Sequence, residues 1–418
     1  MSPLDVLQML GRAGRPGYDD KGYAHVVCEG QDAEKYRRLL REGKEIESRL
    51  AAELDSHLNA EIALGTIRDL DDVMEWLQTT FYYVRAQSAP DQYRFGGKLR
   101  ERVRETLQDL VASGFVETDD ELRVEGTPLG RLASKFYLRL DTARGFADLA
   151  ENAGDIDADD ILAAVASAGE FDSVSARKDE RDAVSAVLGS RGEDLESGAR
   201  KVFAILHASM NGTTPTELKS DAWVIRQNAL RMLAALRAFL DRFAGARAAN
   251  LACRVEARVE HGISADAVGR TAIDGVGAGR ARKLAAAGLA SPRDVRSGGE
   301  AALTDAGLSE GVAERILESV DDLPIAVVEW GSFPDSIGQG ENSMEEVRVR
   351  NVSGGARAGI RVTVNGIEMS STDCYLGERT VPVGVFGGDA EELTFTVEIS
   401  FPALPLAPVT DSRTVDIV

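Results

Sequence analysis

Two arginines lie close to the start of the sequence in a glycine-rich stretch, QMLGRAGRPG, at residues 8–17. Glycines let the main chain approach a phosphate closely, and the planar guanidinium group of arginine pairs with two phosphate oxygens at once. Arg12 and Arg15 are spaced so that both could face one charged group, with Gln8 and Gly11 beside them. An arginine held against a transferring phosphoryl group stabilises the charge of the transition state. The alternative is a glycine-rich turn with solvated arginines.

A second set of arginines lies on a long amphipathic segment, residues 223–243. Arg226 and Arg237 lie beside the apolar face of a helical wheel, whereas Arg231 points away from it. The segment is therefore a locally basic helix within an acidic chain. An ordinary amphipathic helix with solvated arginines and a surface that binds nucleic acid both satisfy this pattern. The side chains that share the apolar face are Ile225, Met232, Leu233, Leu236, Phe239, Leu240 and Phe243.

A glycine-rich turn near residue 277 has the spacing of a helix-hairpin-helix. Glycines at the start of a helix expose main-chain N–H groups, which suit a phosphate. Such a turn binds nucleic acid without reading its base sequence, because it contacts only the sugar-phosphate chain. A role in packing alone is the alternative. The candidate binding residues of this turn are Gly275, Gly277, Gly279, Arg280 and Lys283, and Arg282 adds charge beside them.

The composition limits the classes of protein that the sequence can encode. The net charge is −21 over 418 residues, and lysine supplies 9 of the 48 basic residues, a balance that fits a protein kept soluble in concentrated salt. At about 1 M salt the Debye length is about 3 Å, so long-range repulsion from nucleic acid is mostly screened. The acidity therefore lowers the expectation of nucleic-acid binding without removing it. A soluble acidic protein with no anionic partner is the alternative.

No segment predicts secretion, a membrane span, a disulfide or a metal site. The sequence has no run of 18 apolar residues, and its start lacks the basic and apolar stretches of a signal peptide. Cys28, Cys253 and Cys374 lie far apart, which predicts a reduced, cytoplasmic protein. His25 and His57 lie in apolar segments and are predicted to be packed, and the other two histidines have no partner at ligand spacing.

The periodicity of the apolar residues divides the first part of the chain into three regions. Residues 1–50 combine the arginine loop with a short apolar strand at 23–28 and a charged helix, as at the end of an α/β domain. Residues 51–135 predict three helices followed by two short strands, which is the order of a winged helix. Residues 136–260 predict an almost wholly helical region.

Two further regions complete the chain. Residues 261–323 predict two short helix pairs, and residues 324–418 change to period-two alternation with an Asn-Gly hairpin turn at 365–366. The last region therefore predicts an antiparallel β-sandwich, with Trp330 and Phe333 in its core rather than stacked on a ligand. The predicted fold class is mostly α with a C-terminal all-β domain.

The ten residues from Gln8 to Gly17 closely resemble the sixth conserved motif of superfamily 2 helicases, and specifically of the superkiller-like class. That class includes archaeal repair helicases and the spliceosomal unwinding helicase. Further matches follow in the order of the family. Residues 54–81 resemble its winged helix, residues 127–137 the junction after the wing, and residues 170–206 its helical ratchet domain. Together with the composition, the resemblance predicts a source in a halophilic archaeon.

The resemblance gives each of the five regions an expected identity. They would be the remnant of the second RecA-like motor domain, a winged helix, the helical ratchet, a helix-hairpin-helix and an immunoglobulin- or fibronectin III-like sandwich. Gln8, Gly11, Arg12 and Arg15 would contact the phosphates of ATP, with the two arginines in the catalytic role. The basic helix at 223–243 would line a channel for single-stranded DNA or RNA.

The sequence has neither a GxxxxGK[ST] phosphate loop nor an Asp-Glu pair in a DExH context. By the resemblance, ATP and Mg²⁺ would bind only where N-terminal RecA-like motor domains complete the site, so we expect no ATP hydrolysis by this chain alone. We also expect Met1 to be an internal methionine of a longer helicase, and a protein partner on the sandwich. The alternatives are a stand-alone nucleic-acid-binding or protein-interaction module with a vestigial loop, and an independent enzyme of another type.

Overall fold

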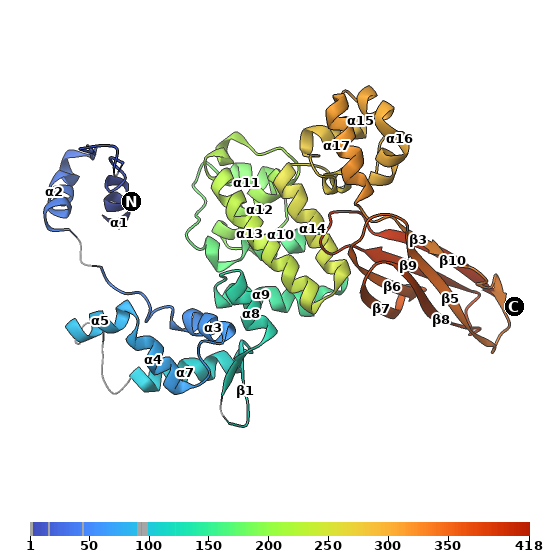
Figure 1. The fold of residues 1–418 in the computed structure, drawn as a ribbon, viewed down its shortest axis with the longest axis horizontal. Coiled ribbons are helices and arrows are strands. Elements are labelled where there is room, and N and C mark those ends of the chain that lie inside the picture. The colour runs from blue at the N-terminus through green and yellow to red at the C-terminus, as the bar shows by residue number, and fades with distance from the viewer. Residues whose placement is uncertain (1–2, 16, 44–45, 90–92, 94–98, 122) are drawn as a thin grey trace. The chain divides into compact units, whose positions relative to one another are not determined.

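The structure is a computed structural model that describes residues 3–15, 17–43, 46–89, 93, 99–121 and 123–418 (Figure 1). The chain divides into two compact units. The first consists of residues 1–112 and 118–124, and the second of residues 113–117 and 125–418. The border falls in sequence within a short two-stranded sheet, β1 (Val116–Thr118) and β2 (Val124–Gly126).

The first unit begins with two helices, α1 (Pro3–Leu10) and α2 (Ala33–Glu42), the second preceded by the 3-10 turn η1 (Gly30–Asp32). The predicted strand at 23–28 is wrong, because residues 21–29 have no regular secondary structure. A strand needs a neighbouring strand for its main-chain hydrogen bonds, and the described residues of this unit place none beside it. The charged helix predicted after it is α2.

The predicted order of a winged helix is present, with one helix more than the sequence predicted. The described helices are α3 (Leu54–Leu64), α4 (Leu70–Gln78), α5 (Phe81–Ser88) and α7 (Leu99–Ala112). Asp69 caps α4, because its Oδ1 atom accepts hydrogen bonds from the Asp71 and Asp72 amides at 2.9 Å. Apolar side chains at helical spacing form the core of this part, including Leu58, Ile62, Val73, Leu77 and Val103.

The second unit begins with a helical bundle. Its helices are α8 (Pro128–Lys135), α9 (Leu140–Glu151), α10 (Ala158–Ala166), α11 (Arg181–Leu188), α12 (Ser197–Met210), α13 (Lys219–Phe243) and α14 (Ala246–His261). The rings of Phe146 on α9 and Phe239 on α13 meet edge to face at 5.8 Å inside the bundle. The apolar face predicted for α13 is buried, except that Phe243 is 36% exposed at the end of the helix.

Three helices follow the bundle, drawn in orange in Figure 1: α15 (Ala278–Ala286), α16 (Pro292–Asp305) and α17 (Glu310–Asp321). The 3-10 turn η5 (Val268–Ala272) connects them to α14. Their small apolar core includes Val268, Leu284, Leu303 and Ile316. Two short helix pairs were predicted here, and η5 with α15 and α16 with α17 form those pairs.

The C-terminal part is a sandwich of two sheets. One sheet has the order β4-β10-β9-β6-β7 and the other the order β3-β5-β8. Phe333 is buried between them, where its ring meets Phe395 at 5.0 Å, and Trp330 packs against the same core. Both are therefore core side chains, as predicted. The strands are β3 (Ala326–Glu329), β4 (Ser336–Ile337), β5 (Asn342–Asn351), β6 (Arg357–Val364), β7 (Ile367–Tyr375), β8 (Glu378–Phe386), β9 (Glu392–Ser400) and β10 (Val409–Ile417).

The sandwich is antiparallel as predicted, apart from a short parallel pairing of β4 with β10. The predicted hairpin turn joins β6 to β7, and its residues Asn365 and Gly366 have φ values of 48° and 81°. Two positive φ values match the right-handed twist of paired strands. From residue 51 onward the elements therefore follow the predicted regions in type, while the five domain boundaries themselves stay a prediction.

Candidate nucleic-acid interface

The arginine loop directly follows α1. The Gly11 amide donates to the Leu7 carbonyl at 2.9 Å, so the chain leaves the helix at the first glycine. Gln8, Arg12 and Arg15 are exposed. The Nε atom of Arg15 lies 3.2 Å from Asp19, and this hydrogen bond lowers the pKa of the Asp19 carboxyl group. Both arginines are open to solvent. A phosphate would have to displace Asp19 before it could pair with Arg15.

Helix α13 presents an exposed face that carries no carboxylate. The exposed residues of this helix are Lys219, Ser220, Trp223, Val224, Gln227, Asn228, Arg231, Arg242 and Phe243. Its two acidic residues are partly buried and paired: Asp221 with Lys201 at 2.6 Å, and Asp241 with Arg357 of the sandwich. In a chain with 69 acidic residues, this helix therefore offers a surface of neutral, aromatic and basic groups.

The three arginines predicted on α13 have three different environments. Arg231 is exposed, and its Nη1 atom donates to the main-chain carbonyls of Phe136 at 2.9 Å and Tyr137 at 3.5 Å. Arg237 pairs with Glu256 of α14 at 3.0 Å. Arg226 is half-buried, and its Nε atom has no hydrogen-bond partner within the part of the chain that the structure describes. Arg231 is thus the one of these three that lies fully on the exposed face.

The glycines of the predicted hairpin turn are placed as expected, because Gly277 is the N-cap of α15 and Gly275 has a φ of 75°. The basic side chains around them also contact main-chain carbonyls. Lys283 donates to Gly307 at 2.9 Å, which joins the first helix pair to the second. The remaining contacts of this kind are Arg280 with Gly275 and Arg282 with Gly262. A phosphate bound at this turn would have to pair with side chains that already donate hydrogen bonds to main-chain carbonyls.

The second helix pair, α16 and α17, is acidic. A shallow depression on α16 and α17 is lined by Glu300, Glu310, Glu314, Glu318 and Asp321. Like charges repel a phosphate backbone, so this side of the module is unsuited to nucleic acid. Among the described residues of η5, α15, α16 and α17, which together form the hairpin module, only the glycine turn before α15 has the predicted phosphate-binding features.

A buried ion cluster fixes the start of α13. The Nζ atom of Lys201 lies 2.9 and 2.8 Å from the two Glu180 carboxylate oxygens and 2.6 Å from Asp221, and Arg177 flanks both acids. Lys201 and Glu180 are each 1% exposed. Burial alone would raise the pKa of Glu180, but hydrogen bonds from Lys201 and from the Arg177 amide outweigh it and the pKa is lowered. The hydrogen bond from Lys201 likewise lowers the pKa of Asp221.

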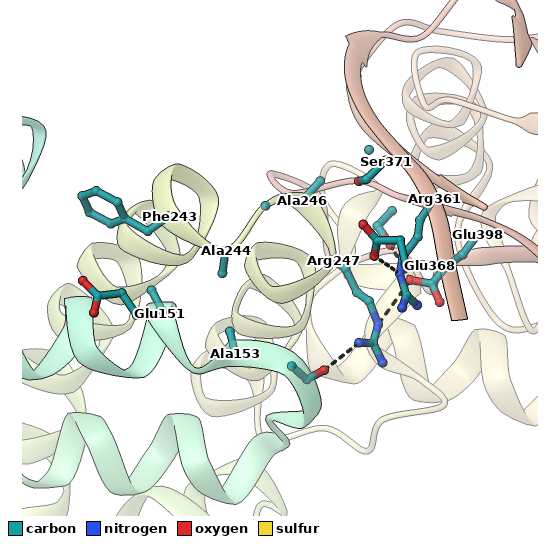
Figure 2. A pocket seen from close by; sticks show the side chains of 15 residues that line it. Glu151, Ala153, Phe243, Ala244, Ala246, Arg247, Arg361, Glu368, Ser371 and Glu398 are labelled. Carbon is teal, nitrogen blue, oxygen red and sulfur yellow. Dashed lines mark hydrogen bonds and ion pairs between the residues drawn. The ribbon is translucent and has the colours of Figure 1, made fainter. Parts of the chain in front are cut away.

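A pocket of about 340 Å³ lies between the bundle and the outer face of the five-stranded sheet (Figure 2). Arg247 spans it, donating to the Gly154 carbonyl at 3.2 Å and lying 3.5 Å from Glu398. Arg361 is paired with Glu368 at 2.6 Å. Each arginine of the pocket is neutralised by a glutamate, so the pocket has no excess positive charge for a phosphate.

Other predicted features fall outside any site. His25 and His57 are exposed, so the prediction that they are packed is wrong. A single apolar segment does not decide which side of it faces a core. Within the described ranges, no group of three or more His, Cys, Asp or Glu side chains could hold a metal ion. No helix there is long and apolar enough to cross a bilayer.

Two aromatic residues on the surface of the second unit were not predicted to be functional. Trp223 is 67% exposed and Tyr137 is 87% exposed. Trp223 could have been found from the helical wheel, because it lies opposite the apolar face where an aromatic ring has no core to join. Nothing in the local sequence could have shown that Tyr137 has a φ of 52°, a value uncommon outside glycine.

The chain belongs to the Sec63 Brl domain family, whose model matches residues 126–408. The match begins at the end of β2 and runs through the bundle, the hairpin module and most of the sandwich. A second model, described as a winged helix-turn-helix domain, matches residues 47–122. The two matches together cover most of the chain that follows α2, and the last strand, β10, lies beyond them.

Two proteins that are similar to this chain carry helicase names, and a third is named as a subunit of a complex. "Probable ATP-dependent DNA helicase HFM1" of Xenopus tropicalis is 36% identical over 195 residues, which are 43% of this chain and 14% of that protein. DExH-box ATP-dependent RNA helicase DExH12 of Arabidopsis thaliana is 32% identical over 201 residues, 46% of this chain and 9% of that protein. Activating signal cointegrator 1 complex subunit 3 of Danio rerio is 35% identical over 192 residues, 43% of this chain and 12% of that protein. The chain thus spans 9–14% of the length of each of these relatives.

Proposed function

We propose that this chain is the C-terminal portion of an ATP-dependent superkiller-like helicase and that it contacts single-stranded nucleic acid through α13. The carboxylate-free exposed face of α13 is the observation that carries the proposal. Single strands are held by positive charge along the backbone together with aromatic rings on which bases stack. Arg231 and Trp223 supply one of each on this face. The relatives named as DNA and RNA helicases support the same reading.

The arginine loop fits a supporting role in an ATP site rather than a complete one. Arg12 and Arg15 offer guanidinium groups that could pair with phosphate oxygens once Asp19 is displaced from Arg15. When bound, Mg²⁺ would neutralise charge on the β- and γ-phosphates of ATP. Among the described residues, no group of three or more His, Cys, Asp or Glu side chains could hold a metal ion, and we propose that a motor domain supplies the ligands of Mg²⁺. We therefore propose that these arginines act in an ATP site shared with such a domain.

The test of the single-strand proposal is fluorescence anisotropy with a labelled oligonucleotide, once as DNA and once as RNA, over a range of salt concentrations. We expect salt-sensitive binding, because released counterions drive such complexes. Removing a stacking ring costs about 1–3 kcal/mol, so Trp223→Ala should weaken binding by roughly five- to a hundredfold. Phe386→Ala, which removes an exposed ring of the sandwich, is the matched control and should bind as the wild type does.

Two outcomes would contradict the proposal. Equal affinity of the wild type and Trp223→Ala would remove α13 from the interface. Absence of binding by the wild type at low salt would favour a protein-interaction module with a vestigial loop. A separate measurement tests the ATP site: nucleic-acid-stimulated ATP hydrolysis by the purified chain would show that no further motor domain is needed.

A further inference from the structure

Tyr137 occupies a main-chain position that normally belongs to glycine. It follows the C-cap of α8, where its amide donates to the Ser134 carbonyl at 3.1 Å and the Leu138 amide donates to the Ala133 carbonyl at 2.9 Å. These bonds form the helix-ending motif that places one residue in the left-handed region. That residue is Tyr137, with a φ of 52°. A side chain with a Cβ atom pays a conformational cost there that glycine does not.

The fold gives no structural reason for an aromatic side chain at this position. Tyr137 is 87% exposed, whereas its neighbour Leu138 is 5% exposed and belongs to the core. Asn365 is the other non-glycine residue with positive φ in the described ranges, and its side chain has a clear structural task. Its Oδ1 atom accepts a hydrogen bond from the Thr394 amide at 2.8 Å. Backbone strain without a packing reward is a mark of functional sites.

Two cations lie close to the chain segment that carries Tyr137. Arg231 of α13 donates through Nη1 to the carbonyls of Phe136 and Tyr137, which ties the end of α8 to α13. Arg231 is exposed, so its other N–H groups remain available to a phosphate. Lys135 lies over the Phe136 ring at 5.5 Å, one residue further along the same corner. An exposed aromatic residue with cations on the neighbouring chain matches the way single strands are bound.

We propose that Tyr137 is a base-stacking residue and that the single-strand interface extends from α13 across this corner, with Arg231 on the phosphate. The inference rests on the proposed function, because it assigns a further contact to the same interface. A strand that runs along α13 past Trp223 and Arg231 reaches the Tyr137 ring next. The left-handed backbone turns that ring away from the core and toward solvent, where a base can stack on it.

Tyr137→Gly tests the proposal because it separates folding from binding. Glycine is favoured at a positive φ, so the thermal unfolding midpoint should be equal to or higher than that of the wild type. Affinity for a single-stranded oligothymidylate should fall by roughly five- to a hundredfold, because one stacked base is lost. Tyr137→Phe should bind as the wild type does. Asn365→Gly is the matched control, since it also relieves a positive φ but should leave affinity unchanged.

A second readout reports stacking directly. An oligothymidylate that carries one 2-aminopurine should lose fluorescence on binding to the wild-type chain and to Tyr137→Phe, and should keep more of it with Tyr137→Gly. Equal affinity and equal quenching with Tyr137→Gly would overturn the role of Tyr137 while leaving Trp223→Ala to decide the role of α13. No binding by the wild type would overturn both proposals together.

Discussion

The side-chain amide of Asn250 fastens α14 to the sandwich by donating to the main-chain carbonyl of Phe401 at 2.9 Å. The same Nδ2 atom lies 3.0 Å from the Leu404 carbonyl and 3.1 Å from the Leu406 carbonyl. Asn250 is 1% exposed, so water does not replace these bonds. One buried side-chain amide therefore lies within hydrogen-bond distance of three main-chain carbonyls in the loop between β9 and β10, and it connects the helical bundle to the sandwich.

Asn250→Asp should destabilise the protein more than Asn250→Ala does. Alanine removes the donor and leaves buried carbonyls without a partner, at a cost of about 1–3 kcal/mol. An ionised aspartate has the same shape but cannot donate, and it places a negative charge against three carbonyl oxygens in a buried site. Urea unfolding of the variants measures the order. Asn228→Ala on the exposed face of α13 is the control, with an expected change within about 0.5 kcal/mol. An aspartate variant as stable as the wild type would contradict this account.

Lys201→Met should be among the most destabilising single changes in the bundle. It leaves Glu180 buried without its cation, and breaking a buried ion pair in this way costs about 3–5 kcal/mol. Lys201→Met/Glu180→Gln should recover part of that loss, because Glu180 no longer places an uncompensated charge inside, and the partly exposed Asp221 keeps Arg177 at 3.6 Å. The free energy of unfolding of the two variants in urea checks this, and a double variant less stable than the single one would argue against charge burial as the cause.

The same cluster predicts a loss of stability in acid. The pKa values of Glu180 and Asp221 are lowered in the folded protein, so the folded state binds protons less readily than the unfolded state. The stabilisation is present above the ordinary carboxyl pKa values of 4.5 and 3.8 and is lost as the pH falls through the lowered values. Thermal unfolding between pH 6 and about pH 3 should show this slope. In Lys201→Met/Glu180→Gln the slope should be shallower, and an unchanged slope would assign the acid sensitivity to other carboxylates.

Much of the fold could be predicted from local patterns. The apolar spacing within residues 51–135 predicted helices, of which α7 is one, and the buried face of α13 followed from its wheel. The hairpin at residues 365–366 was predictable because its turn type requires positive φ, which the Asn-Gly pair accepts. In each case the information lies within a few residues of the feature that it determines.

The misses depend on contacts between distant parts of the chain. The apolar run at 23–28 has the composition of a strand, but pairing decides whether a strand forms. The charge of Lys283 was visible, whereas its contact with Gly307 depends on how the two helix pairs pack. The exposed ring of Tyr137 depends on how α8 ends. These are properties of tertiary structure. The sequence therefore allowed the helix α13 to be predicted, but not which side chains lie together on the surface of the candidate interface.

Arg231→Gln and Arg237→Gln should separate contact with nucleic acid from support of the fold. Arg231 is exposed, so its loss should reduce the dependence of log affinity on log salt by about one phosphate contact. Arg237 holds Glu256, whose pKa burial already raises. Arg237→Gln should therefore lower the thermal unfolding midpoint and leave the dependence of log affinity on log salt as it is in the wild type. Anisotropy titrations at several salt concentrations and a thermal melt of each variant give both quantities. If Arg237→Gln changed the salt dependence and Arg231→Gln lowered the thermal stability, the two roles would be exchanged.

Gly359→Ala should weaken the packing of the bundle against the sandwich, and adding Ala246→Gly should restore that packing. Gly359 lies on β6 directly against the first residue of α14, so a Cβ atom added there would collide with the Cβ atom of Ala246. Overpacking of this kind costs about 1–3 kcal/mol, because backbone must shift on both sides. In Gly359→Ala/Ala246→Gly the single methyl group lies on residue 359 instead of residue 246, and the collision between the two Cβ atoms is gone. Unfolding in urea should therefore show a clear loss for Gly359→Ala and a smaller one for the double variant. Additive losses in the double variant would mean that the two residues do not share this contact.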